Sequence, residues 1–486
     1  RFIKNIYFGV RMIFSQTLSP KQKALEINLD PRIYGAFAEI GAGQETARHF
    51  FQAGGAAGTI AKTISAYDMA MSDAIYGKEE THRYVCEPRL IKMLNREFSL
   101  IVKRLQSTRP DDTCFFAFSN TVAAKSFKGQ TDGQGWLGVR FQAYPKAPPS
   151  DAVIHIKMFD KENLQQQETV GRVGVNLIHA CFNFCHDHET FVKALMDGLS
   201  RDRIEVDMIR VDGPAFKGED SRVWSLELVK RGFTDGIMFD SKGNVLQVTD
   251  TLYKKNILVC RGSYRPPTLV NIDMLETGLR NFSHDLPDSE KNSISVLPEI
   301  SMTKFLERGS FDNEDFLARV ELLASLDYGV LITNLDAYHE LSSYLASYTK
   351  KKVAIVLGVY NLEDILDENK YAKHTTGLLG GLGSLIGHNT RLFVYPASEE
   401  DQGKGEMDSL KTSNNIAIKD NVKPLMQFFK KNNLIKDIKD FKKDATGIWS
   451  RTVLRMIQSG EEGWEKMVPE IVAKTVKEKS LFGIQS

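Results

Sequence analysis

The sequence predicts an α/β protein with mixed and partly parallel sheets, a glycine-rich helical amino-terminal region and a helical carboxyl-terminal tail. The clearest observation is an apolar strand at 328–333, a helix at 336–349 and a β-branched strand at 352–357. This order is typical of a βαβ unit, whose two strands lie parallel in one sheet that is covered on both faces. We expect the helix to cross over right-handedly.

Before this unit, the periodicity of apolar residues predicts helices at 44–53, 59–76 and 87–105. In the last of these, Pro88 fits the first turn and the apolar residues share one face. Short β-rich runs follow at 113–118, 152–158 and 204–211.

From residue 221 onward, strands and helices alternate along the chain. We expect helices at 221–232, 271–282 and 313–326, strands at 236–239, 256–260, 293–300 and 391–395, a helical tail from 421 and a last helix near 467–479.

Changes in composition and in predicted secondary structure along the chain suggest four parts. They are a glycine-rich helical region at 1–110, a central mixed part at 111–285, the βαβ-containing part at 286–400 and the helical tail at 401–486. Polar or proline-bearing linkers are expected at 143–151, 284–292 and 398–412.

The composition is that of an ordinary globular protein. The 486 residues carry a net charge of +1, with 63 lysines and arginines against 62 acidic residues, so no global field recruits nucleic acid. No run of eighteen apolar residues predicts a transmembrane helix. Five cysteines are few for this length, which favours free thiols in a reducing compartment such as the cytoplasm.

The first 25 residues carry basic and apolar side chains but no acidic one. We interpret them as an amphipathic docking helix. The alternative is the remnant of an organelle presequence, which would place the protein in an organelle matrix.

Residues 36–77 combine glycine clusters at 41–43 and 54–58 with charged side chains. Such clusters expose backbone N–H groups that can face an anion, so we predict a phosphate-binding site here. Its expected ligand-binding residues are Gly41, Gly43, Arg48, Gly54, Gly55, Gly58 and Lys62, and its acid/base candidates are Glu45, His49 and Asp68. The alternative is close packing of small-residue helices.

Neither cluster matches a known nucleotide motif. Gly41-x-Gly43-x-x-Thr46 lacks the third glycine of the dinucleotide fingerprint and follows no clear strand, and the segment ending at Lys62 lacks the spacing of a phosphate loop.

The string from His179 to His188 contains Cys181 and Cys185, which would share one helix face. Thiolate and imidazole ligands suit zinc, but no second ligand pair lies elsewhere in the sequence. We therefore predict that Cys181, Cys185, His186 and His188 do not jointly bind a metal.

Arg261, Ser263 and Arg265 directly follow the strand expected at 256–260. Ligands bind at the carboxyl ends of strands in open α/β sheets. Two arginine side chains there could each donate paired hydrogen bonds to a phosphate, so we add these three residues to the ligand-binding set. A solvated loop is the alternative. The glycines of 377–387 predict tight helix packing, and the hydrolase motifs G-x-S-x-G and H-E-x-x-H are absent.

Several strings, among them GAFAEIGAGQE, RHFFQAGGAAGTIAK, LYKKN, RGSYRP, TSNN and GWEKMVPE, occur together over nearly the whole chain. In these the chain resembles an uncharacterised family of soluble bacterial proteins of about this length. Members of that family carry two unrelated labels, nicotinate-nucleotide adenylyltransferase and TonB-dependent receptor. The sequence has neither the H-x-G-H motif expected of the first nor the signal peptide and alternating strands expected of the second.

Together these observations predict an enzyme that acts on a phosphate-bearing small molecule, such as a nucleotide, by group transfer. The sequence does not identify a cofactor. The alternative is a non-catalytic subunit that forms a homo-oligomer or joins a larger assembly.

Overall fold

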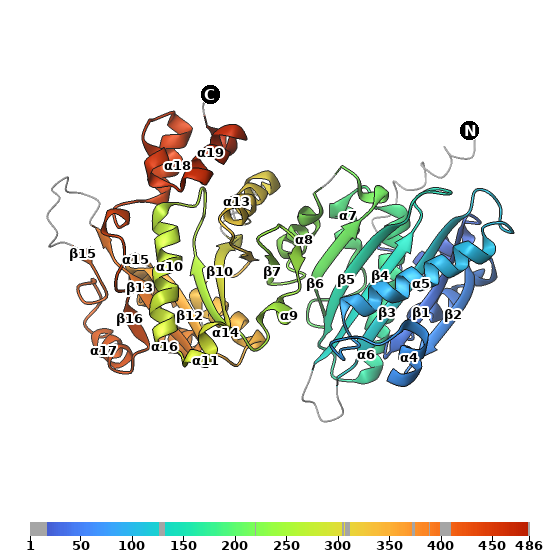
Figure 1. The fold of residues 1–486 in the computed structure, drawn as a ribbon. Helices are drawn as coiled ribbons and strands as arrows, with labels where there is room; N and C mark the ends of the chain where they lie inside the picture. Colours follow the sequence, from blue (N-terminus) through green and yellow to red (C-terminus); the bar gives the residue numbers. More distant parts are fainter. Residues whose placement is uncertain are drawn as a thin grey trace. The chain divides into compact units, whose positions relative to one another are not determined.

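The computed structural model describes residues 17–125, 132–218, 220–303, 306, 312–371, 375–387, 389–398 and 410–484. It divides the chain into two compact units, unit 1 (Arg1–Thr234) and unit 2 (Asp235–Ser486). Both contain helices packed on a mixed sheet, so the predicted α/β fold class is confirmed (Figure 1).

The two units differ from the four parts suggested by the sequence. The expected boundary at residue 110 falls inside one sheet, because strand β1 (Ile33–Gly41) pairs with strand β3 (Cys114–Ala123). The change in composition near residue 110 therefore marks the step from a helix to a strand. It does not mark a change of domain.

Unit 1 is built on a six-stranded sheet in the order β2-β1-β3-β4-β5-β6. Strand β1 lies parallel to both of its neighbours, and the remaining pairs are antiparallel. The other strands are β2 (Ile60–Ala66), β4 (Gly133–Phe141), β5 (Ser150–Met158) and β6 (Ile204–Asp212).

Helices cover both faces of this sheet. One face packs against α5, which crosses β1, β3 and β4 in Figure 1, and the other packs against α3 and α6. The helices of unit 1 are α2 (Pro20–Leu29), α3 (Thr46–Ala53), α4 (Met69–Tyr76), α5 (Glu87–Leu105), α6 (Asn163–Asn183), α7 (His188–Leu195) and α8 (Ser221–Lys230).

The helix predicted at 59–76 is wrong over its first half, which forms strand β2. The statement that no strand precedes Gly41 is also wrong, because β1 ends at this residue. Strand β1 contains two alanines and two glycines and is buried almost throughout its length, and β2 mixes small and polar residues, so neither shows the alternation that marks a half-exposed strand.

Unit 2 is built on an eight-stranded sheet in the order β16-β13-β12-β9-β10-β11-β7-β8. The six strands from β16 to β11 are parallel, and β7 and β8 extend the sheet in antiparallel fashion. The strands are β7 (Gly236–Phe239), β8 (Val245–Leu246), β9 (Asn256–Arg261), β10 (Ile294–Ser301), β11 (Val330–Thr333), β12 (Val353–Gly358), β13 (Thr390–Tyr395) and β16 (Ile435–Asp437).

Numbered by their appearance in the chain, the parallel strands lie in the order 3-2-1-4-5-6. This is the strand order of doubly wound nucleotide-binding sheets, in which the direction of winding reverses between strands 1 and 4. Here the reversal lies between β9 and β12. The predicted βαβ unit is confirmed in that β11 and β12 are parallel in one sheet, although β9 and β10 lie between them.

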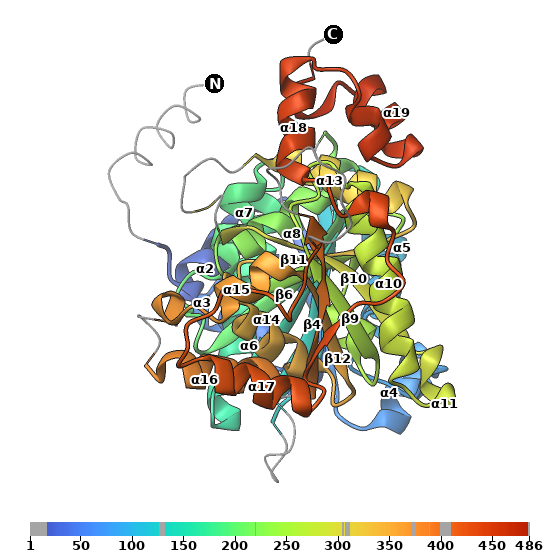
Figure 2. The ribbon, with the colours of Figure 1, turned by 90° about the vertical axis from the view of Figure 1, so that its left-hand side faces the viewer.

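The helices of unit 2 follow this winding. Helix α10 packs on one face of β9 and β12, whereas α14 and α15 lie on the other (Figure 2). The helices are α9 (Val248–Leu252), α10 (Leu269–His284), α11 (Asp288–Lys291), α13 (Asn313–Ser325), α14 (Tyr338–Tyr348), α15 (Val359–Ile365), α16 (Gly377–Ile386), α17 (Lys423–Lys431), α18 (Ser450–Ser459) and α19 (Glu470–Glu478).

The glycines of 377–387 do form a packed helix, α16. A Cβ atom on Gly381 would lie 2.1 Å from the ring of Tyr371, so this glycine permits a close contact. The amphipathic segment expected at the amino terminus lies mostly outside the described residues, as does much of the linker expected at 398–412. No helix in the described ranges is both long and apolar enough to span a membrane.

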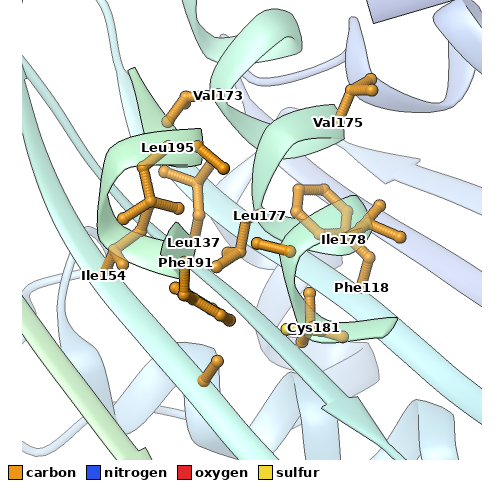
Figure 3. Packing of buried hydrophobic residues seen from close by; sticks show 14 of the residues in the cluster. Phe118, Leu137, Ile154, Val173, Val175, Leu177, Ile178, Cys181, Phe191 and Leu195 are labelled. Carbon is orange, nitrogen blue, oxygen red and sulfur yellow. The ribbon is translucent and has the colours of Figure 1, made fainter. Parts of the chain in front are cut away.

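The core of unit 1 lies between the sheet and α6. Figure 3 shows Leu177 and Cys181 of α6 among side chains from β3, β4 and β5. Leu177 is fully buried, whereas Leu164 on the same helix is 64% exposed.

We expect Leu177→Ala to lower the free energy of unfolding by about 2–5 kcal/mol, because it leaves a cavity in a close-packed interior. Leu164→Ala should change it by less than about 0.5 kcal/mol. Urea denaturation of both variants measures the difference, and equal costs would contradict the placement of α6.

Candidate ligand-binding site

The first glycine cluster forms the turn between β1 and α3. Gly41 has a φ of +75°, and a Cβ atom on it would lie 2.2 Å from the carbonyl oxygen of Val122. A Cβ atom on Gly43 would lie 2.3 Å from Oδ1 of Asn120. Both glycines are therefore required for the close approach of this turn to β3.

The amino terminus of α3 already holds a carboxylate. The backbone N–H groups of Thr46 and Ala47 donate to Oε1 and Oε2 of Glu39, at 2.9 and 3.3 Å. The Glu39 side chain also accepts from Asn120, and it is 4% exposed. Burial raises its pKa to about 7 even though these donors favour the charged form. Glu39 thus occupies the position in which an external anion would bind.

The predicted charged residues of this segment lie on two faces of the sheet. Lys62 pairs in register with Ala36, on the face covered by α5, and its Nζ lies 2.5 Å from Oε2 of the buried Glu97. Arg48 and His49 belong to α3, which packs on the opposite face. The structure therefore does not bring Lys62 together with these two residues.

The remaining predicted residues have local partners. Arg48 pairs with Glu45 at 3.2 Å. His49 is half-buried beside Gly171 of α6, and burial lowers its pKa. Asp68 caps α4 by accepting from the N–H group of Met71.

The second glycine cluster returns the chain from α3 to β2. Gly54 and Gly55 have φ values of +88° and +75°, and Gly54, Gly55 and Gly58 are all exposed. They form a turn and are not packed between helices. Anion binding by the glycine segment stays a prediction.

The cysteines of the metal-like string lie in the core of unit 1. Cys181 is fully buried and Cys185 nearly so, and burial raises the pKa of both thiols. His188 lies near the carboxylates of Glu189 and Glu227, with ligand atoms within 4.8 Å of one another.

Basic side chains accompany these two carboxylates. Arg231 lies 2.5 Å from Glu227, and Lys230 approaches both glutamates. The charge of the cluster is therefore balanced by the protein's own cations.

In unit 2, Arg261 joins the carboxyl ends of three strands. Its guanidinium donates through Nε and Nη2 to the buried carboxylate of Glu299 on β10, at 2.6 and 3.0 Å. Thr333 of β11 donates to the same carboxylate. Burial lowers the pKa of Arg261 and Glu299 raises it, with a net upward shift. The predicted positive charge is therefore present but neutralised.

The same guanidinium also holds the loop after β11, by donating to the carbonyl oxygens of Leu335 and Asp336. Of the other two predicted residues, Arg265 pairs with Asp315 of α13 at 2.6 Å, whereas Ser263 is exposed.

A cavity of about 1000 Å³ opens beside this network, at the carboxyl edge of the parallel sheet. It is lined by residues that follow β9, β11, β12 and β13, including Arg261 and Ser263. The cavity therefore lies where the winding reverses, between the loop after β9 and the loop after β12. Ligands of open α/β sheets bind at this position.

The amino terminus of the sixteen-residue helix α10 lines the cavity through Val270 and Asn271. Oδ1 of Asn271 accepts from the backbone N–H and the hydroxyl of Thr268, at 3.0 and 2.8 Å. This fixes the amide with its Nδ2 donor on the side away from Thr268, and Nδ2 has no hydrogen-bond partner among the described residues. Asn271 is only 8% exposed, and it lines the cavity.

Aromatic side chains form much of the remaining lining. The ring centroid of Trp449 lies 5.5 Å from that of Tyr360, with 51° between the planes. Lys411 Nζ lies 4.4 Å from the Tyr360 centroid. The aromatic residues of the lining are Tyr338, Tyr360, Tyr371, Tyr395 and Trp449.

Charged groups at the cavity are few and balanced. The lining contains the carboxylates of Asp336 and Asp364, the imidazole of His339 and the cations Lys370, Arg451 and Arg261, the last of which pairs with Glu299. Lys370 lies 3.6 Å from Asp364, whereas Arg451 forms no ion pair within the described part of the chain. The carboxylates and the imidazole are the groups here that could transfer a proton.

The sequence pointed to Arg261 and Ser263 but not to Asn271, Tyr360 or Trp449. Thr268 and Asn271 have the three-residue spacing of a helix capping box, which could have marked the start of α10. Trp449 carries no comparable signal, because it reaches the cavity from a segment far along the chain.

A scan against protein-family models finds no match for this chain, and no curated protein matches it. Among solved structures, a competence/damage-inducible protein from Agrobacterium tumefaciens is 15% identical, and the match covers 34% of this chain and 98% of that one with a TM-score of 0.25. A CinA superfamily protein from Enterobacter cloacae is 10% identical, with coverage of 35% and 97% and a TM-score of 0.27. Likeness this low supplies no argument about the fold or function of this chain.

The buried Glu39 makes stability depend on pH. Its pKa rises from 4.5 to about 7 on folding, so its destabilising effect develops as pH rises from about 4.5 to 7 and is complete above that. Relative to Glu39→Gln, the protein should therefore lose about 3 kcal/mol across this window. Urea denaturation of both proteins from pH 4.5 to 8 measures the difference, and a constant difference would contradict the raised pKa.

Arg261→Met should lower the free energy of unfolding by about 3–5 kcal/mol, because it leaves the Glu299 carboxylate buried without its partner. The double variant Arg261→Met/Glu299→Met should recover most of this loss. Lys351→Met serves as the control, since its pair with Glu290 is partly exposed to solvent and is worth less than about 1 kcal/mol. If the double variant is less stable than Arg261→Met, the pair is not the source of the effect.

Proposed function

We propose that unit 2 binds a phosphate-bearing small molecule in the cavity between the β9 and β12 loops, and that the protein is an enzyme acting on this molecule by group transfer. The observation that carries the proposal is the free Nδ2 donor of the buried Asn271 at the amino terminus of α10. Helix amino termini attract anions, because their first N–H groups lack helical acceptors and carry a positive partial charge.

Two further features support a phosphate ligand. Arg451 is an exposed cation of the lining that forms no ion pair with a carboxylate of the described residues. The cavity is also within the size range of small-molecule sites, and its lining combines apolar and aromatic surface with a few polar groups.

The reaction requires a group that accepts or donates a proton. Asp336, His339 and Asp364 line the cavity and are the candidates for this role. Arg261 donates to the backbone carbonyl oxygen of Asp336 and so fixes the loop that carries this residue; its role is to position the loop.

The second candidate function is that of a non-catalytic subunit, and one observation favours it for unit 1. The amino terminus of α3, where the glycine segment would hold an anion, is occupied by Glu39. We therefore assign the ligand to unit 2 and a structural role to unit 1.

Asn271→Asp tests the proposal. The aspartate keeps the oxygen that accepts from Thr268, but it replaces the donor with a negative oxygen facing the ligand. We expect binding of inorganic pyrophosphate, measured by calorimetry at low salt, to weaken at least about 10-fold, since a hydrogen bond to a charged group contributes about 1.5–3 kcal/mol.

The control is Asn313→Asp, which makes the same change of charge in the first turn of α13, outside the cavity. It should bind as the unaltered protein does. Equal binding by the Asn271→Asp variant, or no binding of pyrophosphate by the unaltered protein, would overturn the phosphate site.

A further inference from the structure

One aromatic corner of the cavity is formed by two residues that come from distant parts of unit 2. Tyr360 lies on α15, directly after β12, and Trp449 directly precedes α18. Their rings meet at 51°, so they form an open corner and not a closed stack. A planar group placed in this corner can stack on one ring and contact the edge of the other.

Two charged side chains beside Tyr360, those of Lys411 and Glu363, help to fix the position of its ring. Lys411 lies over the Tyr360 ring and pairs with Glu363 of the same helix at 2.8 Å. Glu363 therefore holds the Lys411 ammonium in place over the Tyr360 ring, and this contact supports the ring.

The corner and the anion-binding donor belong to opposite halves of the crevice. Asn271 follows β9, whereas Tyr360 follows β12, and both line the same cavity. A ligand that contacts both needs an anionic group and a planar aromatic group joined by a spacer.

We infer that the ligand is a nucleoside phosphate whose base packs in the corner formed by Tyr360 and Trp449 while its phosphate binds at Asn271 and the amino terminus of α10. This inference rests on the proposed phosphate site and names the chemical class of its ligand. Every nucleobase has a π face, so any of them can stack on an aromatic ring. The corner would therefore favour ligands that carry a base but would not distinguish one base from another.

The chain contains a built-in reporter of this contact. Of its four tryptophans, Trp136, Trp224 and Trp464 are at most 3% exposed, whereas Trp449 is only partly buried and lines the cavity. A base that packs on Trp449 should therefore quench the accessible part of the tryptophan fluorescence.

The test titrates the full-length protein with AMP, ribose 5-phosphate and adenosine, using calorimetry and tryptophan fluorescence. We expect AMP to bind at least about 10-fold more tightly than ribose 5-phosphate, since one stacked base accounts for roughly a 5- to 150-fold gain in affinity. AMP should quench the fluorescence, and ribose 5-phosphate should not.

Variants at the corner separate stacking from folding. Trp449→Ala should weaken AMP binding about 10-fold and leave ribose 5-phosphate binding unchanged, which also shows that the site is folded. Trp449→Phe should abolish the quenching while it retains most of the affinity. The control Tyr253→Ala removes an aromatic ring that is 58% exposed and lies outside the cavity, and it should change neither readout.

The outcomes distinguish the two proposals. If AMP and ribose 5-phosphate bind equally and without quenching, the aromatic corner is not a base site, although the phosphate site stands. If adenosine binds as tightly as AMP and Asn271→Asp has no effect, the corner stands and the phosphate site is wrong. If none of the three probes binds, both are wrong.

Discussion

The ion pair between Arg261 and Glu299 is the interaction on which the carboxyl edge of unit 2 depends. Without it, the buried carboxylate of Glu299 would keep the Thr333 hydroxyl as a donor but lose its cation, and the carbonyl oxygen of Asp336 would lose the guanidinium that donates to it. One planar guanidinium, with its donors in a fixed fork, satisfies the carboxylate and both carbonyls together. The geometry of the cavity floor therefore follows from the shape of this side chain.

Such a pair stabilises less than its short distances suggest, because both charges had to leave water. Its value lies in specificity. A pair of apolar side chains could fill the same space, but they would leave the carbonyl oxygen of Asp336 without the guanidinium and that of Leu335 with the Ser301 hydroxyl alone, so the loop before α14 would be held less firmly. Arg261 thus has a role inside the protein, and its predicted role in anion binding stays a prediction.

The sequence predicted most of unit 2, because its strands are apolar runs separated by amphipathic helices. It did not reveal the strand order, which depends on pairing between distant segments and decides where the winding reverses. In unit 1 the sequence predicted α5 but not β1 or β2. Gly35 and Gly41 of β1 permit its close approach to β3, and neither strand carries an alternating pattern of apolar residues.

The candidate site could be anticipated only in part for a related reason. Arg261 and Ser263 follow a recognisable strand, so their place at a strand end could be read locally. Asn271, Tyr360 and Trp449 meet only after the sheet has formed. Conversely, the conspicuous glycines at 41 and 43 permit the close approach of their turn to β3, and the amino terminus of α3 beside them donates to the protein's own Glu39.

The placement of Trp449 has a consequence for incomplete chains. The last strand of the eight-stranded sheet, β16, ends at Asp437, and Trp449 comes after it. A chain interrupted between these two points, for example by a premature stop codon, would possess every strand and the whole network around Arg261 but would lack one wall of the cavity. The same chain would also lack α18 and α19, whose buried apolar residues pack against Ala318 and Leu322 of α13, so a wall of the cavity and a part of the apolar core would be lost together.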